Sequence, residues 1–236
     1  MTPLFLLKDT KINFKNLQTI RKNIIKHSPN PKKVNIVAVT KTFSFSAIRS
    51  SEKNKIFNIG ESKIQETQQK TQKEKTNKKT QIHLIGHLQS NKVRLAVLLY
   101  DTIQSVDSIK ILKKINKSAK TKGKTQKIFL QLNVSEKETQ KGFKKTEIKE
   151  AAKIAKKLTN IKNEGIMSIG PQTKNKTVIK KKFQEVKKIQ RNIQKTIDKQ
   201  CVSLSLGMSE DYVVALQEGS THLRLGTILF EGRNKN

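Results

Sequence analysis

The stretch NIVAVTK, residues 35–41, is a short run of mostly apolar and β-branched residues that ends in a lysine. Such runs are typical of strands buried on both faces of a parallel sheet. They alternate along the chain with longer, lysine-rich amphipathic segments. This alternation predicts repeated strand–helix units and therefore a parallel α/β fold.

We expect strands at residues 34–40, 56–59, 82–85, 102–105, 127–133, 165–168, 202–206 and 222–225, and eight parallel strands are the number that closes a barrel. One helix is expected before the first strand, at residues 13–27. The others are expected at residues 44–54, 62–74, 90–99, 108–120, 146–159, 175–199 and 210–218. The pattern predicts a single (β/α)8 TIM-type barrel with an extra N-terminal helix.

No Gly/Ser-rich or Pro-rich linker divides the 236 residues, and the composition is uniform along the chain. A barrel of this length can fold as one unit. We therefore expect residues 1–236 to form one domain, in preference to a doubly wound open sheet.

The formal net charge is +32, which would suit a partner with a phosphate backbone. The lysines, however, are spread over every predicted helix and do not form one stripe. We therefore expect no specific nucleic-acid partner, although nonspecific binding to polyanions at low salt is expected from the charge alone.

The single cysteine, Cys201, excludes an intramolecular disulfide and a metal site built from cysteines. The apolar run near the N-terminus has no basic segment before it and no small-residue cleavage site after it. We expect a cytoplasmic protein with no signal peptide, no membrane span and no metal.

Polar residues follow the predicted strands, and in a barrel the C-terminal ends of the strands share one face. Lys41 ends the first strand, and a lysine there can form a Schiff base with an aldehyde. The other candidates, in chain order, are Asn58, Gly60 and Glu61, Gly86, His87, Gln89, Ser90, Asn91 and Lys92, Asn133 and Ser135, and Ser205, Gly207, Met208 and Ser209.

The segments SLGMSED and STHLRLGT follow or contain the last two predicted strands, where barrels often hold phosphate. Gly207 and Gly226 would let the backbone approach an anion closely, and hydroxyl groups such as that of Thr227 would donate hydrogen bonds. A helix that begins near Met208 would point its positive end at the anion.

Eight motifs, in order along nearly the whole chain, resemble the pyridoxal phosphate homeostasis proteins, a family similar in fold to the N-terminal barrel domain of alanine racemase. The motifs are VAVTK, FNIGESKIQE, HLIGHLQSNKVR, TIQSVDS, IFLQLNVSEKETQKGF, GIMSIG, LSLGMSED and GSTHLRLGTILFEGR.

The resemblance implies that Lys41 carries pyridoxal 5′-phosphate (PLP) as an internal aldimine and that Arg224 faces the pyridine nitrogen. It implies that Gly226 and Thr227 hold the phosphate, with Ser205 or Ser209 as a further donor from one loop. The full set of cofactor-binding residues expected from it is Lys41, Asn58, Ser205, Met208, Ser209, Arg224, Gly226 and Thr227.

The sequence departs from the family pattern at four positions. Ser62 stands where the family usually has Asn, His87 where it has Pro, Ile82 where it has Trp, and Glu231 where it has Gly. Each departure puts the family's local loop geometry in question, and those at Ser62 and His87 could alter contacts on the cofactor side.

The favoured interpretation is a PLP-binding protein of intracellular PLP and amino-acid homeostasis, without strong catalytic activity and with no catalytic residue assigned. The alternatives are a PLP-dependent amino-acid racemase and a basic nucleic-acid binder. An arginine opposite the pyridine nitrogen disfavours ring protonation and so weakens the cofactor as an electron sink. Tyr100 and Tyr212 are expected to be structural. We expect a monomer, with PLP-dependent apo-enzymes as candidate recipients of the cofactor.

Overall fold

The computed structural model describes residues 10–135 and 139–230. The departure at Glu231 therefore lies outside the described residues. No helix in these two ranges is long and apolar enough to cross a membrane.

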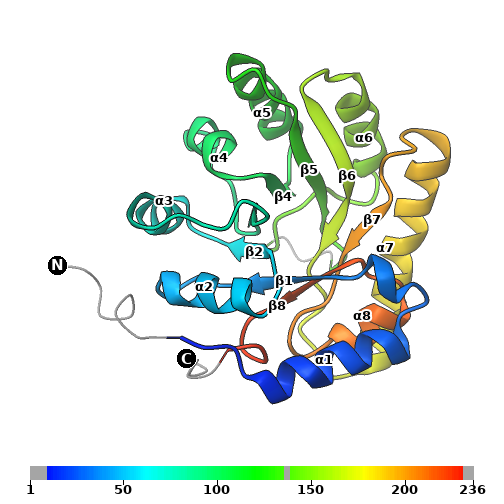
Figure 1. Ribbon diagram of the computed structural model, residues 1–236. Helices are drawn as coiled ribbons and strands as arrows, with labels where there is room; N and C mark the ends of the chain where they lie inside the picture. Colours follow the sequence, from blue (N-terminus) through cyan, green and yellow to red (C-terminus); the bar gives the residue numbers. More distant parts are fainter. Residues whose placement is uncertain (1–9, 136–138, 231–236) are drawn as a thin grey trace.

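Eight parallel strands form a closed barrel in the order β1 to β8, with β8 paired back to β1 (Figure 1). This confirms the predicted fold class. The strands are β1 (Asn35–Val39), β2 (Asn58–Glu61), β3 (Gln81–Leu84), β4 (Thr102–Val106), β5 (Gln126–Leu132), β6 (Ile161–Ser168), β7 (Ser203–Ser205) and β8 (His222–Leu225).

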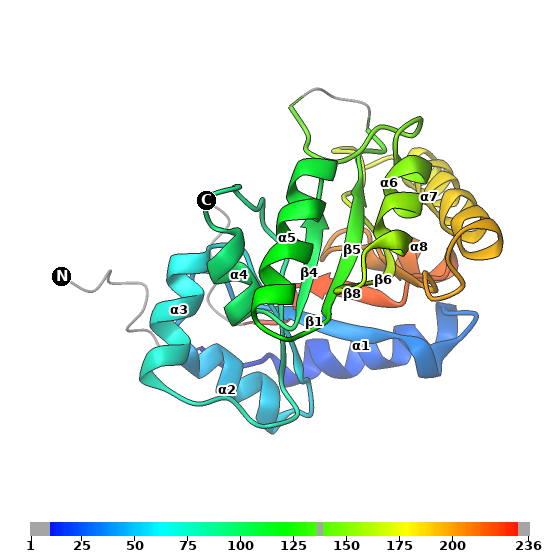
Figure 2. The same cartoon turned by 90° about the horizontal axis from the view of Figure 1, so that it is seen from above.

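Helices surround the strands on the outside, and Figure 2 shows the same arrangement from above. They bury one apolar face each against the barrel, as the helical spacing of their apolar residues predicts. The helices are α1 (Phe14–His27), α2 (Phe45–Lys53), α3 (Ile64–Lys73), α4 (Val93–Leu99), α5 (Ile109–Thr121), α6 (Ile148–Lys157), α7 (Lys176–Thr196) and α8 (Tyr212–Gln217), and a short 3-10 helix, η2, spans Pro31–Lys33.

The extra N-terminal helix, α1, is tied to the segment that follows the last strand of the barrel. The side chain of Asn13 caps the helix by accepting from the Asn16 N–H, and the Asn13 N–H donates to the Leu229 carbonyl at 2.9 Å. The rings of Phe43 and Phe230 pack beside this junction with centroids 5.3 Å apart. These contacts attach the start of α1 to the outside of the barrel.

The predicted second strand is shifted from the observed one. Residues 54–57 turn the chain out of α2, because the Ile56 N–H bonds back to the Ser51 carbonyl and Lys55 adopts a positive φ of 58°. β2 consequently begins at Asn58, which pairs with Gln81 at the start of β3. The expectation that Asn58 follows the strand is wrong, since it opens the strand.

Two histidines lie in the barrel interior. His83 and His222 have ring centroids 6.2 Å apart, and the edge of Phe129 packs against His222. Burial lowers the pKa of His83 to about 3 and that of His222 to about 4. Both imidazoles are therefore neutral at physiological pH.

The neutral state of His83 predicts an acid-sensitive stability. Below its ordinary pKa of roughly 6.5, a histidine in the unfolded chain binds a proton that buried His83 does not bind. The free energy of unfolding should therefore fall on acidification, by about 1.4 kcal/mol per pH unit for this residue between about pH 6 and pH 4. Denaturant titrations of the wild type and of His83→Gln over this range would measure the slope.

The variant should show the smaller slope. Glu61 and Asp211, whose pKa values burial raises, act in the opposite direction, but they are present in both proteins and cancel in the comparison. Equal slopes would show that His83 does not resist protonation in the folded barrel.

Candidate functional site

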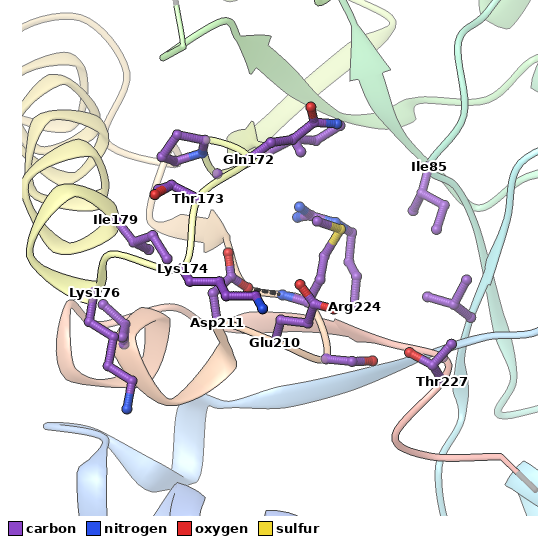
Figure 3. Close-up of a pocket in the computed structure, with 18 of the residues that line it drawn as sticks. Ile85, Gln172, Thr173, Lys174, Lys176, Ile179, Glu210, Asp211, Arg224 and Thr227 are labelled. Atoms are coloured by element: carbon purple, nitrogen blue, oxygen red, sulfur yellow. Dashed lines mark hydrogen bonds between the residues drawn. The ribbon is translucent and has the colours of Figure 1, made fainter. Parts of the chain in front are cut away.

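A cavity of about 930 Å³ opens at the C-terminal ends of the strands. Its walls come from the segments that follow β1, β2, β3, β6, β7 and β8. Figure 3 shows Gln172 to Lys174 after β6, Glu210 and Asp211 after β7, and Arg224 with Thr227 from β8 and the residues after it. This is the face at which the sequence predicts functional residues.

Lys41 lines the cavity from the tight turn that ends β1. The Thr40 N–H still bonds to β2, at the Gly60 carbonyl, and the Phe43 N–H closes the turn on the Thr40 carbonyl at 3.1 Å. Lys41 is half-buried as a residue, and its backbone is fixed on both sides. A neutral amine in this position is a nucleophile for an aldehyde.

Arg224 lies on β8, the strand adjacent to β1, and its side chain is only 5% exposed. Its guanidinium donates to the Ser205 carbonyl at 2.6 Å, to the Ser205 Oγ at 2.7 Å and to the Ser168 carbonyl at 2.8 Å. Burial lowers the pKa of Arg224 to about 10, with Asp211 acting in the opposite direction. The group therefore stays positively charged at neutral pH.

A line of hydrogen bonds runs from Arg224 through the barrel interior. Ser205 Oγ accepts from Arg224 and donates to Gln104 Oε1 at 2.6 Å, and Gln104 Nε2 lies 3.0 Å from His83 Nδ1. His83 Nε2 in turn lies 3.1 Å from Asn58 Oδ1. With His83 neutral and protonated on Nε2, every group in this line donates to the next.

The loops after β7 and β8 bind each other at one side of the cavity. Gly207 has a φ of 89°, and a Cβ there would lie 2.6 Å from the Cβ of Ala215, so only glycine fits. Ser209 Oγ accepts from the Ile228 N–H at 3.2 Å, which leaves its hydroxyl hydrogen as a donor. Among the described residues, the Gly226 and Thr227 N–H groups donate no hydrogen bond. These donors suit an anion.

The expected helix start near Met208 is wrong. α8 begins at Tyr212, and the Asp211 carboxylate folds back to accept from the Met208 N–H at 2.6 Å. A short aspartate side chain satisfies this turn locally, in competition with the helix. The donors that the cavity presents to an anion at this side are therefore loop N–H and hydroxyl groups and not a helix end.

The structure brings most of the predicted cofactor residues together. Ser205 supports Arg224 without lining the cavity. Asn58 does not reach the cavity because it opens β2, and it lines a separate groove at the other end of the strands. The predicted residues that line the cavity are Lys41, Met208, Ser209, Arg224, Gly226 and Thr227.

The segment after β6 belongs to the cavity, although it was not among the predicted site residues. Residues 169–174 form one wall of the cavity. The signal was present in the sequence, because Ile169 follows a predicted strand directly and is itself followed by Gly170 and Pro171. Asp211, which holds the loop after β7, was also missed.

The cavity is lined by three lysines, one arginine and backbone donors, together with two acidic residues: Lys41, Lys174, Lys176, Arg224, Glu210 and Asp211. The described residues that line it include no histidine, cysteine or tyrosine. Both tyrosines are bonded elsewhere, Tyr100 to Thr67 and Tyr212 to Asn23, each at 2.7 Å. The described ranges also hold no cluster of three potential metal ligands. The site suits an anionic molecule that carries an aldehyde.

Comparison with known proteins agrees with this geometry. The alanine racemase N-terminal domain family matches residues 12–234. A pyridoxal phosphate homeostasis protein from Synechocystis is 34% identical, over 86% of this chain and 93% of that protein. One of the same name from Haemophilus influenzae is 31% identical, over 87% of each chain.

A solved structure of PipY from Synechococcus elongatus with PLP bound superposes with a TM-score of 0.80. It is 27% identical in sequence, and the match covers 91% of this chain and 97% of PipY. The chain thus belongs to the pyridoxal phosphate homeostasis protein family, within the alanine racemase N-terminal domain fold.

Proposed function

We propose that this protein binds PLP as a Schiff base on Lys41 and acts in PLP homeostasis without strong catalytic activity. The observation that carries the proposal is that Lys41 and Arg224, on adjacent strands, line one cavity together with the unpaired donors of the Gly226 loop. The three groups match an aldehyde, a ring nitrogen and a phosphate.

The donors around the cavity account for each part of the ligand. Lys41 supplies the amine for the aldehyde, and the Gly226 and Thr227 N–H groups with the Ser209 hydroxyl supply donors for the phosphate. Arg224 supplies a donor for the ring nitrogen and cannot itself accept a hydrogen bond. The PLP-bound structure of PipY supports PLP as the ligand.

The same arginine argues against strong catalysis. A bound PLP ring supplies an electron sink, which is strongest when its nitrogen is protonated. Arg224 stays charged at neutral pH and so donates a hydrogen bond without giving up its proton. Neither tyrosine lines the cavity to serve as an acid opposite Lys41. The homeostasis names of the relatives support a role in holding and exchanging PLP, with apo-enzymes as candidate recipients.

Lys41→Ala should abolish the absorbance band of the PLP adduct and the product fixed by borohydride. The phosphate contacts should still hold free PLP, with an affinity lower by about 100-fold, or ~2.7 kcal/mol. Lys174→Ala is the matched control, because Lys174 lines the same cavity on the segment after β6. Peptide mass mapping should place the fixed adduct on Lys41 in the wild type and in this control. A full band in Lys41→Ala would refute the assignment.

Arg224→Glu should shift the absorbance maximum of bound PLP, because a carboxylate at this position favours a protonated ring. Arg224→Gln, which has no charge, should shift it less. Thermal unfolding of both variants would establish that they are folded, since each loses bonds to Ser205 and Ser168. The same maximum in folded Arg224→Glu as in the wild type would show that Arg224 does not face the ring.

The racemase alternative predicts that the protein exchanges the α-proton of an amino acid with solvent. We expect PLP-loaded wild type in D₂O to exchange the α-proton of L-alanine no more than about tenfold faster than free PLP, as followed by NMR. Exchange that is several orders of magnitude faster, and that is lost in Lys41→Ala, would establish the enzyme.

A further inference from the structure

Two side chains of α3 form hydrogen bonds to the backbone of the turn that carries Lys41. Lys70 Nζ donates to the Thr40 carbonyl at 2.9 Å, and Glu66 Oε1 accepts from the Thr42 N–H at 2.6 Å. Lys70 and Glu66 also bind each other at 2.7 Å, one helical turn apart. One buried ion pair thus holds the residue on each side of Lys41.

Thr42 adopts a strained backbone conformation. Its φ is 67°, in the left-handed region that β-branched residues rarely occupy. Such a conformation costs of order 1–3 kcal/mol and persists only where surrounding contacts impose it. The bond from the Thr42 N–H to Glu66 is such a contact, and it acts on the residue directly after Lys41.

The ion pair belongs to a buried cluster with more acidic than basic groups. Lys70 also bonds to Glu61 Oε1 at 2.8 Å, and the Thr40 hydroxyl donates to the same oxygen at 2.6 Å. Lys70, Glu61 and Glu66 are each less than 10% exposed, and Glu61 Oε2 has no hydrogen-bond partner among the described residues. Since buried ion pairs add little net stability compared with apolar packing, stability alone does not explain this cluster.

We propose that Glu66, held by Lys70, is a positioning residue that fixes the turn of Lys41 so that its amine meets the aldehyde of PLP. This inference rests on the proposed function. Glu66 does not line the cavity and acts only through the backbone on either side of Lys41. A reacting group that is held in place forms its bond more readily than one whose backbone is mobile.

Glu66→Ala is the variant that tests the proposal. It removes the acceptor for the Thr42 N–H but leaves Lys70 paired with Glu61, so that one buried cation still faces one buried carboxylate. Glu66→Gln keeps an acceptor oxygen at the same reach and should restore the turn. The matched control is Glu74→Ala, which removes an exposed carboxylate at the end of the same helix, where it pairs with Arg49.

Absorbance titration with PLP would measure formation of the Schiff base, and pyridoxine 5′-phosphate, which lacks the aldehyde, would report binding without it. Glu66→Ala should bind PLP about tenfold more weakly than the wild type, because it loses one hydrogen bond to a charged group. Its affinity for pyridoxine 5′-phosphate should stay within about twofold of the wild type. Glu66→Gln and Glu74→Ala should behave as the wild type in both titrations.

Three results would overturn the proposal: unchanged PLP affinity in Glu66→Ala, equal weakening for both ligands, or no restoration in Glu66→Gln. Thermal unfolding midpoints without ligand would show that each variant is folded at the titration temperature. Failure of the proposed function looks different, because the wild type itself would then form no reducible adduct on Lys41, and the positioning role would fall with it.

Discussion

The buried charge of Arg224 is the constraint on which the rest of the site depends. A guanidinium that is 5% exposed must have its donors satisfied, and it meets carbonyl groups at the ends of β6 and β7 while standing on β8. These bonds fix the separation of three strand ends. The buried Ser205 hydroxyl that accepts from Arg224 also needs an acceptor for its own hydrogen, which Gln104 provides. Gln104 in turn has its amide group paired with His83.

The two sides of the cavity are built in different ways. The Lys41 side is an extension of the barrel: β1 ends in a turn held by β2 and by the buried pair on α3. The opposite side consists of loops after β7 and β8 that hold each other through Ser209 and the Ile228 N–H. A covalent bond needs an accurately placed atom, whereas a phosphate accepts donors from several directions. The proposed function thus accounts for the stiffer support under the Lys41 amine.

Much of this architecture follows from local sequence pattern. Alternating apolar runs and amphipathic segments predict the barrel, and residues after strands such as Lys41 and Thr227 do meet in one cavity. The prediction fails where a turn competes with a strand or a helix, as at residues 54–57 and at Asp211. The spacing of Glu66 and Lys70 indicates an ion pair, but its bonds to the turn at Thr40 and Thr42 join elements that no local pattern relates.

The lysine content of the chain shows why fixed geometry matters more than residue type here. Lysine and arginine together number 50, and the surface offers many solvated amines to any aldehyde. An exposed lysine gains a Schiff base only at the cost of ordering a long, mobile side chain. Lys41 differs because its backbone is already ordered on both sides and because Arg224 and the anion donors line the same cavity. Under the proposed function, selectivity among so many amines arises from the surroundings of Lys41, and the contact that imposes the strained backbone of Thr42 is part of those surroundings.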